Sequence, residues 1–198
     1  VDIIQAIGRA IRKSENKTIG TIVIPVYLSE ISPDVDDQIL SSRFSSVWKI
    51  VLALKSQDDS LMEEIDSLRV HLGQRGNRVG KQKGINKIIV DLPAKVSTSF
   101  INKFQTILVK NTSDNWNEYY GRLLRYIDEN GTICFQSYVD NEGINLGNWV
   151  GNQRSRKNIL SKEKYDLLDS LEVWNWDERE ARWMEGYYHL QKFVEENG

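Results

Sequence analysis

The sequence has few residues from which a metal centre or a disulfide framework could be built. Its 198 residues include one cysteine, Cys134, and two histidines, His71 and His189. A single cysteine excludes an internal disulfide framework and the usual thiolate zinc sites, which need at least two. The histidines lie far apart, without the spacing of metal ligands. We therefore expect no metal site, and the cysteine usage favours a reducing, cytoplasmic location.

Long apolar runs and a surplus of one charge are also lacking. The longest apolar stretch, 19–28, is interrupted by Gly20, Thr21 and Pro25 and is shorter than the roughly 20 residues of a membrane helix. We expect no signal peptide and no membrane partner. Lys and Arg number 26 against 28 Asp and Glu, a net charge of −2. This balance excludes nucleic-acid binding by bulk positive charge, so any such site must be a local patch.

The sequence does contain a series of amphipathic segments. Apolar spacing predicts helices over 2–12, 35–54, 61–72 and 100–108, and two β-rich stretches predict strands over 19–28 and 88–92. The second and third helices are predicted to form an αα-hairpin joined near 56–60. The predicted fold class is mainly α with a minor β component.

From Asn115 onward the pattern predicts a bundle of three short helices. Gly131 is predicted to stop the first helix, Gly143 to form the turn before the second, and Ser161 to cap the third. Four tryptophans fall where apolar stripes point inward, which favours core packing over base stacking; they are Trp116, Trp149, Trp174 and Trp176. The bundle is small enough to be marginal alone.

An internal repeat connects this bundle with the end of the chain. The segments 116–131 and 183–198 align at a spacing of 67 residues, with seven of sixteen positions identical. Conservative pairs such as Tyr126 with Phe193 preserve the apolar spacing of a helix. The C-terminal segment is therefore predicted to be the first helix of a second, truncated repeat.

Two local concentrations of positive charge are candidates for binding phosphate. Residues 67–90 contain six bases and no acid, and the glycine-rich part, 73–86, is predicted to be a mobile basic loop. Its candidate contact residues are Arg75, Arg78, Lys81 and Lys83. The loop either contacts a phosphate backbone or is a solvated linker, and the sequence leaves both interpretations open.

The second concentration, 154–164, has five bases and one acid. Its candidate nucleic-acid contacts are Arg154, Arg156, Lys157, Lys162 and Lys164, together with the neighbouring Gln153. Gln153 and Arg154 could read base edges if this helix entered a groove. The alternative is a solvated helix end whose cations complement the helix dipole.

Near the N-terminus, two arginines three residues apart share one face of the helix predicted over 2–12. They belong to the string Gln5-Ala6-Ile7-Gly8-Arg9-Ala10-Ile11-Arg12. Paired guanidinium groups suit phosphate oxygens, and Gly8 allows close approach of a backbone or ligand. This string resembles motif VI of the DEAD/DEAH-type helicases of superfamily two, and 19–28 resembles the last strand of their second RecA-like lobe.

The resemblance implies specific roles in the cleft between two lobes. Arg12 would be the arginine finger and Arg9 a second contact to the ATP phosphates, while Gln5 would lie on the nucleotide side. ATP and Mg²⁺ would be the cofactors of the full-length parent. This chain lacks a phosphate-binding loop and an acidic metal-binding motif, so we do not expect catalysis from it alone.

A second resemblance is to the helicase-associated domain, a three-helix module found in tandem copies in bacterial helicases. It rests on Trp116 and Tyr120, on Gly131 and Gly143, and on the segments 146–154 and 171–176. Together the resemblances imply a lobe remnant over 1–30, a helical connector over 31–112, a helicase-associated domain over 113–177, and part of another over 178–198.

The implied function is that of the C-terminal part of an ATP-dependent helicase. Its helicase-associated domain would bind nucleic acid, with DNA favoured over RNA, and would lie beside the remainder of the helicase core. The alternative is a protein-docking module that uses an exposed aromatic surface, for example at Tyr119 or Tyr126.

Overall fold

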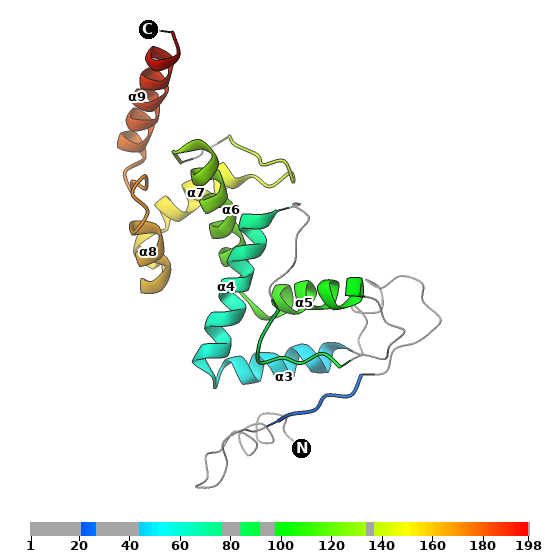
Figure 1. Ribbon diagram of the computed structural model, residues 1–198. Coiled ribbons are helices and arrows are strands. Elements are labelled where there is room, and N and C mark those ends of the chain that lie inside the picture. Colours follow the sequence, from blue (N-terminus) through cyan, green and yellow to red (C-terminus); the bar gives the residue numbers. More distant parts are fainter. Residues whose placement is uncertain (1–20, 27–43, 77–83, 92–97, 134–136, 198) are drawn as a thin grey trace. The chain divides into compact units, whose positions relative to one another are not determined.

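The computed structural model describes residues 21–26, 44–76, 84–91, 98–133 and 137–197 (Figure 1). Within these ranges the chain forms seven α-helices and one short 3-10 helix, η2, and no strand. The helices are α3 (Ser45–Lys55), α4 (Asp59–Arg75), α5 (Thr98–Thr112), α6 (Asn115–Asn130), α7 (Leu146–Ser155), η2 (Lys157–Ile159), α8 (Lys162–Asp169) and α9 (Glu178–Asn197). No helix of the described residues is long and apolar enough to cross a membrane. The mainly helical prediction is confirmed.

The predicted β component is not found in the described residues. Residues 21–26 are extended and alternate between exposed and half-buried positions, but they pair with no described strand. Residues 88–91, from the second predicted strand, are also not in a ladder. A strand is stable only when its backbone groups are paired with another strand, and alternation and β-propensity do not predict that partner. The described residues give no support for a RecA-like remnant.

The chain folds as two compact units, and each is described by itself. The first comprises residues 1–69 and 80–115, and the second comprises 70–79 and 116–198. In the first unit α3 packs against α5 (Figure 1). The rings of Phe44, Trp48 and Phe104 lie 5.6 to 5.8 Å apart and form the aromatic centre of this packing.

The helices of the first unit follow the predicted pattern. α3 ends at Lys55 and α4 begins at Asp59, so the predicted position of the connection between these helices, near 56–60, is confirmed. An ion pair of 2.6 Å joins Lys55 to Asp66, and the same ammonium group donates a hydrogen bond to the carbonyl oxygen of Thr112. α5 is longer than its apolar pattern predicted, since it continues to Thr112.

The prediction of a loop over 73–86 is wrong at its beginning. α4 continues to Arg75, and Gly73 is buried in its last turns. A Cβ atom on Gly73 would lie 2.0 Å from the carbonyl oxygen of Glu118, and one on Gly121 would lie 2.0 Å from that of Val70. These glycines therefore allow the backbones of α4 and α6 to approach closely, which explains a glycine inside a helix. Gly76, with φ +55°, follows the end of α4.

Candidate nucleic-acid interface

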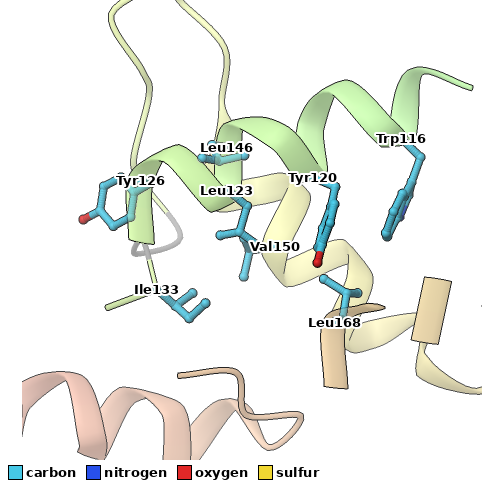
Figure 2. Close-up of a cluster of buried hydrophobic side chains, with 8 residues drawn as sticks. All are labelled: Trp116, Tyr120, Leu123, Tyr126, Ile133, Leu146, Val150 and Leu168. Atoms are coloured by element: carbon cyan, nitrogen blue, oxygen red, sulfur yellow. The ribbon is translucent and has the colours of Figure 1, made fainter. Parts of the chain in front are cut away.

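The second unit contains a three-helix module made of α6, α7 and α8. Its core cluster consists of Trp116, Tyr120, Leu123, Tyr126, Ile133, Leu146, Val150 and Leu168 (Figure 2). Helical spacing puts the apolar side chains of α6 on one face, and α7 and α8 cover that face. The ring of Trp116 stacks on Tyr120 at 5.2 Å. The other three tryptophans of the module are half-buried and pack against the cluster, as the sequence predicted.

The ends of these helices are set by residues that the sequence identified. Gly131, at φ +71°, follows α6, and Gly143, at φ +78°, lies in the turn before α7. The side chain of Asn145 caps α7 by accepting a hydrogen bond from the backbone N–H of Asn148 at 2.9 Å. Ser161 caps α8 in the same way. These predicted turns and the predicted Ser161 cap are confirmed.

A network of charges joins α6 to the loop that precedes α7. The guanidinium group of Arg122 lies 2.6 Å from Asp140, 3.1 Å from Glu118 and 2.9 Å from Glu142. Burial by itself would lower the pKa of Arg122, but its hydrogen bonds to the three carboxylates outweigh burial and raise that pKa.

The same network affects the acid–base behaviour of Asp140. Burial would raise the pKa of Asp140, but backbone N–H groups and Arg122 hold it below its ordinary value. The charged form of each partner is therefore favoured, and the loop is tied to α6 next to the start of α7.

A basic surface covers the end of α7, η2 and the start of α8. It consists of Arg154, Arg156, Lys157, Lys162 and Lys164. The Nε atom of Arg154 donates to the carbonyl oxygen of Asn175 at 2.9 Å, and its guanidinium carbon lies 5.3 Å from the centre of the Trp174 ring. Such cation–π contacts hold a cation at a protein surface without neutralising its charge.

Lys157 sits over a second ring of the same aromatic group. Its Nζ atom lies 5.4 Å from the centre of the Trp176 ring and 5.9 Å from that of Tyr165. Trp174 and Trp176 are themselves in edge contact at 5.2 Å. Arg154 and Lys157 each therefore lie over one ring of a contacting pair of tryptophans, a feature that residue spacing alone did not predict.

The remaining three cations have different surroundings. Lys164 has its Nζ atom 5.4 Å from the centre of the Trp116 ring. Lys162 pairs with Asp166 at 2.5 Å, and both side chains are more than half exposed. Arg156, the residue after α7, is exposed. Arg and Lys side chains at such positions are accessible from solvent and can therefore contact phosphate oxygens.

Gln153, a predicted base-reading residue, is buried. Its side-chain oxygen accepts a hydrogen bond from the indole N–H of Trp116 at 2.9 Å, and its amide nitrogen donates to the carbonyl oxygen of Trp149. Since a buried amide that has internal partners would lose them on turning outward, Gln153 belongs to the core of the module and not to the basic surface.

Two residues that the sequence reasoning missed lie on the opposite face of α7. Asn148 and Asn152 are exposed and four residues apart, so they share one side of the helix. The helical period, applied to polar as well as apolar residues, predicts their position opposite the buried Leu146 and Val150.

Of the other predicted site residues, one lies within the described residues and the rest lie outside them. Arg75 is the last residue of α4 and is half-buried. Those outside the described residues are Gln5, Gly8, Arg9, Arg12, Arg78, Lys81 and Lys83. In the described ranges no group of three His, Cys, Asp or Glu side chains could hold a metal ion.

The helix predicted for the second repeat is present as α9. Asp177 precedes it and accepts hydrogen bonds from the backbone N–H groups of Glu180 and Arg179, and these bonds lower the pKa of Asp177. The rings of Trp183 and Tyr187 stack at 5.6 Å, as Trp116 and Tyr120 do in α6. The apolar stripe of α9 is nevertheless exposed, and it comprises Trp183, Met184, Tyr187, Leu190, Phe193 and Val194.

Helices α6, α7 and α8 thus form a small three-helix module that carries the basic surface. In a comparison with known protein families, residues 113–177 match the helicase associated domain. The helicase-associated domain predicted for this segment is confirmed. No curated protein and no solved structure matches the chain.

Proposed function

We propose that the helicase-associated domain of this chain binds nucleic acid through the basic surface. The observation that carries the proposal is that Arg154 and Lys157 lie over Trp174 and Trp176, two tryptophans in contact with each other. The module as a whole has more acids than bases, so the local concentration of charge matters and the net charge does not. Phosphate contacts need only accessible cations, which this surface supplies.

Salt dependence provides the test. If all five cations contact phosphates of duplex DNA, the affinity should fall with a log–log slope of about −4.5, because each contact contributes about −0.9. Between about 50 and 200 mM salt this amounts to a loss of roughly 500-fold. The double variant Arg156→Gln/Lys157→Gln should have a slope of about −2.7 and lose only about 40-fold over the same range. Fluorescence anisotropy with a labelled duplex and a labelled single strand measures both.

The matched control removes the same charges elsewhere in the unit. Arg179 and Lys192 are exposed on α9, outside the basic surface. Arg179→Gln/Lys192→Gln should bind with the wild-type slope. Absence of binding at low salt to either probe, or a slope that Arg156→Gln/Lys157→Gln leaves unchanged, would refute the proposal.

We further propose that the chain is the C-terminal part of a bacterial, ATP-dependent helicase of the DEAD/DEAH type. The support is the resemblance of Gln5 to Arg12 to motif VI, together with the helicase associated domain match. Arg9 and Arg12 would then contact ATP phosphates in the presence of Mg²⁺ and a first lobe.

The full-length protein tests the helicase assignment. Arg12→Ala should reduce nucleic-acid-stimulated ATP hydrolysis by about 10³-fold, as expected for an arginine finger, and Lys13→Ala should not. A full reading frame that lacks a phosphate-binding loop would overturn this assignment and leave the binding proposal intact.

Docking to a protein is the second candidate function. Tyr119 and Tyr126 do not form an exposed aromatic surface, because Tyr126 is buried and Tyr119 is half-buried against Trp149. The observation that favours docking is the exposed stripe of α9, in which Trp183 is 66% and Phe193 64% accessible. If docking is the function, Trp183→Ser/Phe193→Ser should abolish binding of the chain to the remainder of the helicase core, and charge reversal at Arg154 and Arg156 should leave it unchanged.

A further inference from the structure

The exposed face of α7 is polar and carries no large side chain. It carries Asn148, Asn152 and Ser155, with Gly151 between them. The opposite face is buried through Leu146 and Val150, each 1% accessible. α7 is thus fixed to the module by one face and presents a row of small polar groups on the other.

The two amides on this face are available to a ligand. In the described part of the chain neither side-chain amide of Asn148 or Asn152 has a hydrogen-bond partner, although the backbone of Asn148 is capped by Asn145. A Cβ atom on Gly151 would have no heavy atom within 4 Å, so the surface between the two asparagines is open. Arg156, the next residue along this row, begins the cationic part of the surface.

We propose that α7 enters the major groove of duplex DNA and that Asn148 and Asn152 read base edges there. This inference rests on the proposed nucleic-acid binding. The major groove of B-form DNA is about 12 Å wide and admits an α-helix, whereas that of an RNA duplex is too deep and narrow for side chains to read. A carboxamide pairs with the N6 and N7 atoms of adenine, so the preferred site contains adenines.

The aromatic groups near the basic surface favour a duplex over stacking on unpaired bases. The rings of Tyr165 and Trp176 stack on each other at 4.8 Å with an interplanar angle of 4°, and Lys157 lies over both. A platform for single strands needs a ring face on which a base can lie. Here these rings hold a cation beside the end of α7, where it can contact a flanking phosphate.

The test starts from a pool of duplexes of about 20 base pairs with a randomised centre, from which the 198-residue chain selects its ligands. The chain should enrich a sequence that contains adenines and bind it about 100-fold more tightly than a scrambled duplex, with about 10-fold from each asparagine. Asn148→Ala and Asn152→Ala should each reduce this preference by about 10-fold while leaving the affinity for the scrambled duplex and the salt slope unchanged.

Asn102 on α5 provides the matched control, because it is also an exposed helical asparagine and lies outside the module. Asn102→Ala should keep the full preference. Thermal unfolding followed by circular dichroism checks that the variants fold, and exposed Asn→Ala changes in a helix should not lower stability.

The remaining outcomes separate this inference from the proposed function. Duplex binding without an enriched sequence, an enriched sequence whose preference survives both asparagine variants, or binding to single strands alone overturns this inference and leaves the proposed function standing. Absence of binding to the duplex pool and to a single strand at low salt defeats the proposed function and this inference with it.

Discussion

The crossing of α4 and α6 predicts that alanine at Gly121 destabilises the second unit. Its Cβ atom would lie 2.0 Å from the carbonyl oxygen of Val70 and 3.1 Å from the backbone nitrogen of Gln74. Real Cβ atoms do not approach other heavy atoms below 3.0 Å, so the two backbones must separate by about 1 Å. Neither obstacle is a flexible side chain that could turn away.

Two opposing terms set the size of the effect. Alanine is the better helix former by about 1 kcal/mol, which favours the variant. Overpacking costs about 1 to 3 kcal/mol, and backbone obstacles place this site at the upper end. The net expectation for Gly121→Ala is a loss of about 2 kcal/mol, or a fall in Tm of roughly 10 °C for a unit of this size.

Gly151→Ala is the matched control, since it makes the same change in a helix where a Cβ atom meets nothing within 4 Å. It should gain about 0.5 to 1 kcal/mol from helix propensity alone. Thermal unfolding followed by far-UV circular dichroism, with urea unfolding as a second measurement, gives both values. The reasoning is refuted if Gly121→Ala is as stable as the wild type while Gly151→Ala gains the expected amount.

Three further predictions concern the charge network, the core and the last helix. Because the pKa of Asp140 is lowered in the fold, its contribution to stability is complete above the ordinary value of 3.8 and is lost as the pH falls through the lowered one. Asp140→Asn should therefore lower the free energy of unfolding, measured in urea, by about 2 kcal/mol at neutral pH, which is less than the loss expected on removing one partner of an isolated buried ion pair. The difference from the wild type should shrink in acid, and a difference that does not change with pH would contradict this. Trp116→Phe leaves the buried oxygen of Gln153 without its donor and should cost about 1 to 3 kcal/mol, whereas in the background Gln153→Leu it should cost less, as a double-mutant cycle would measure. Trp183→Ser/Phe193→Ser should lower the fluorescence of a bound hydrophobic dye without lowering Tm, and an unchanged signal would place the exposed apolar surface elsewhere.

The sequence was a good guide wherever the signal is local. The spacing of Trp116, Tyr120 and Leu123 predicts the buried face of α6 because the helical period alone decides which side chains share a side. Gly131 and Ser161 mark helix ends for equally local reasons, namely a positive φ angle and a side-chain cap.

The predictions that the structure corrects involve contacts with residues that are distant in the sequence. Local sequence predicts a loop at Gly73 because glycine is a poor helix former, whereas in the structure this glycine allows α4 to cross α6 some 45 residues later. The run of cations beside Gln153 predicts a surface position for it, but its hydrogen-bond partner in the core, Trp116, is 37 residues away in the sequence. At the basic surface, residue spacing identified the cations but not the tryptophans that hold Arg154 and Lys157.

The cation–π contacts of Arg154 and Lys157 affect how much side-chain entropy the proposed binding of nucleic acid would cost. A long cationic side chain that must be immobilised by a ligand loses rotamer freedom worth about 0.5 to 1.5 kcal/mol. Arg154, held by the carbonyl of Asn175 and the ring of Trp174, gives up much of that freedom when the protein folds. The exposed Arg156 would lose this freedom only in the proposed association with nucleic acid. Of these two guanidinium groups, Arg154 would therefore lose less rotamer freedom in the proposed binding of nucleic acid.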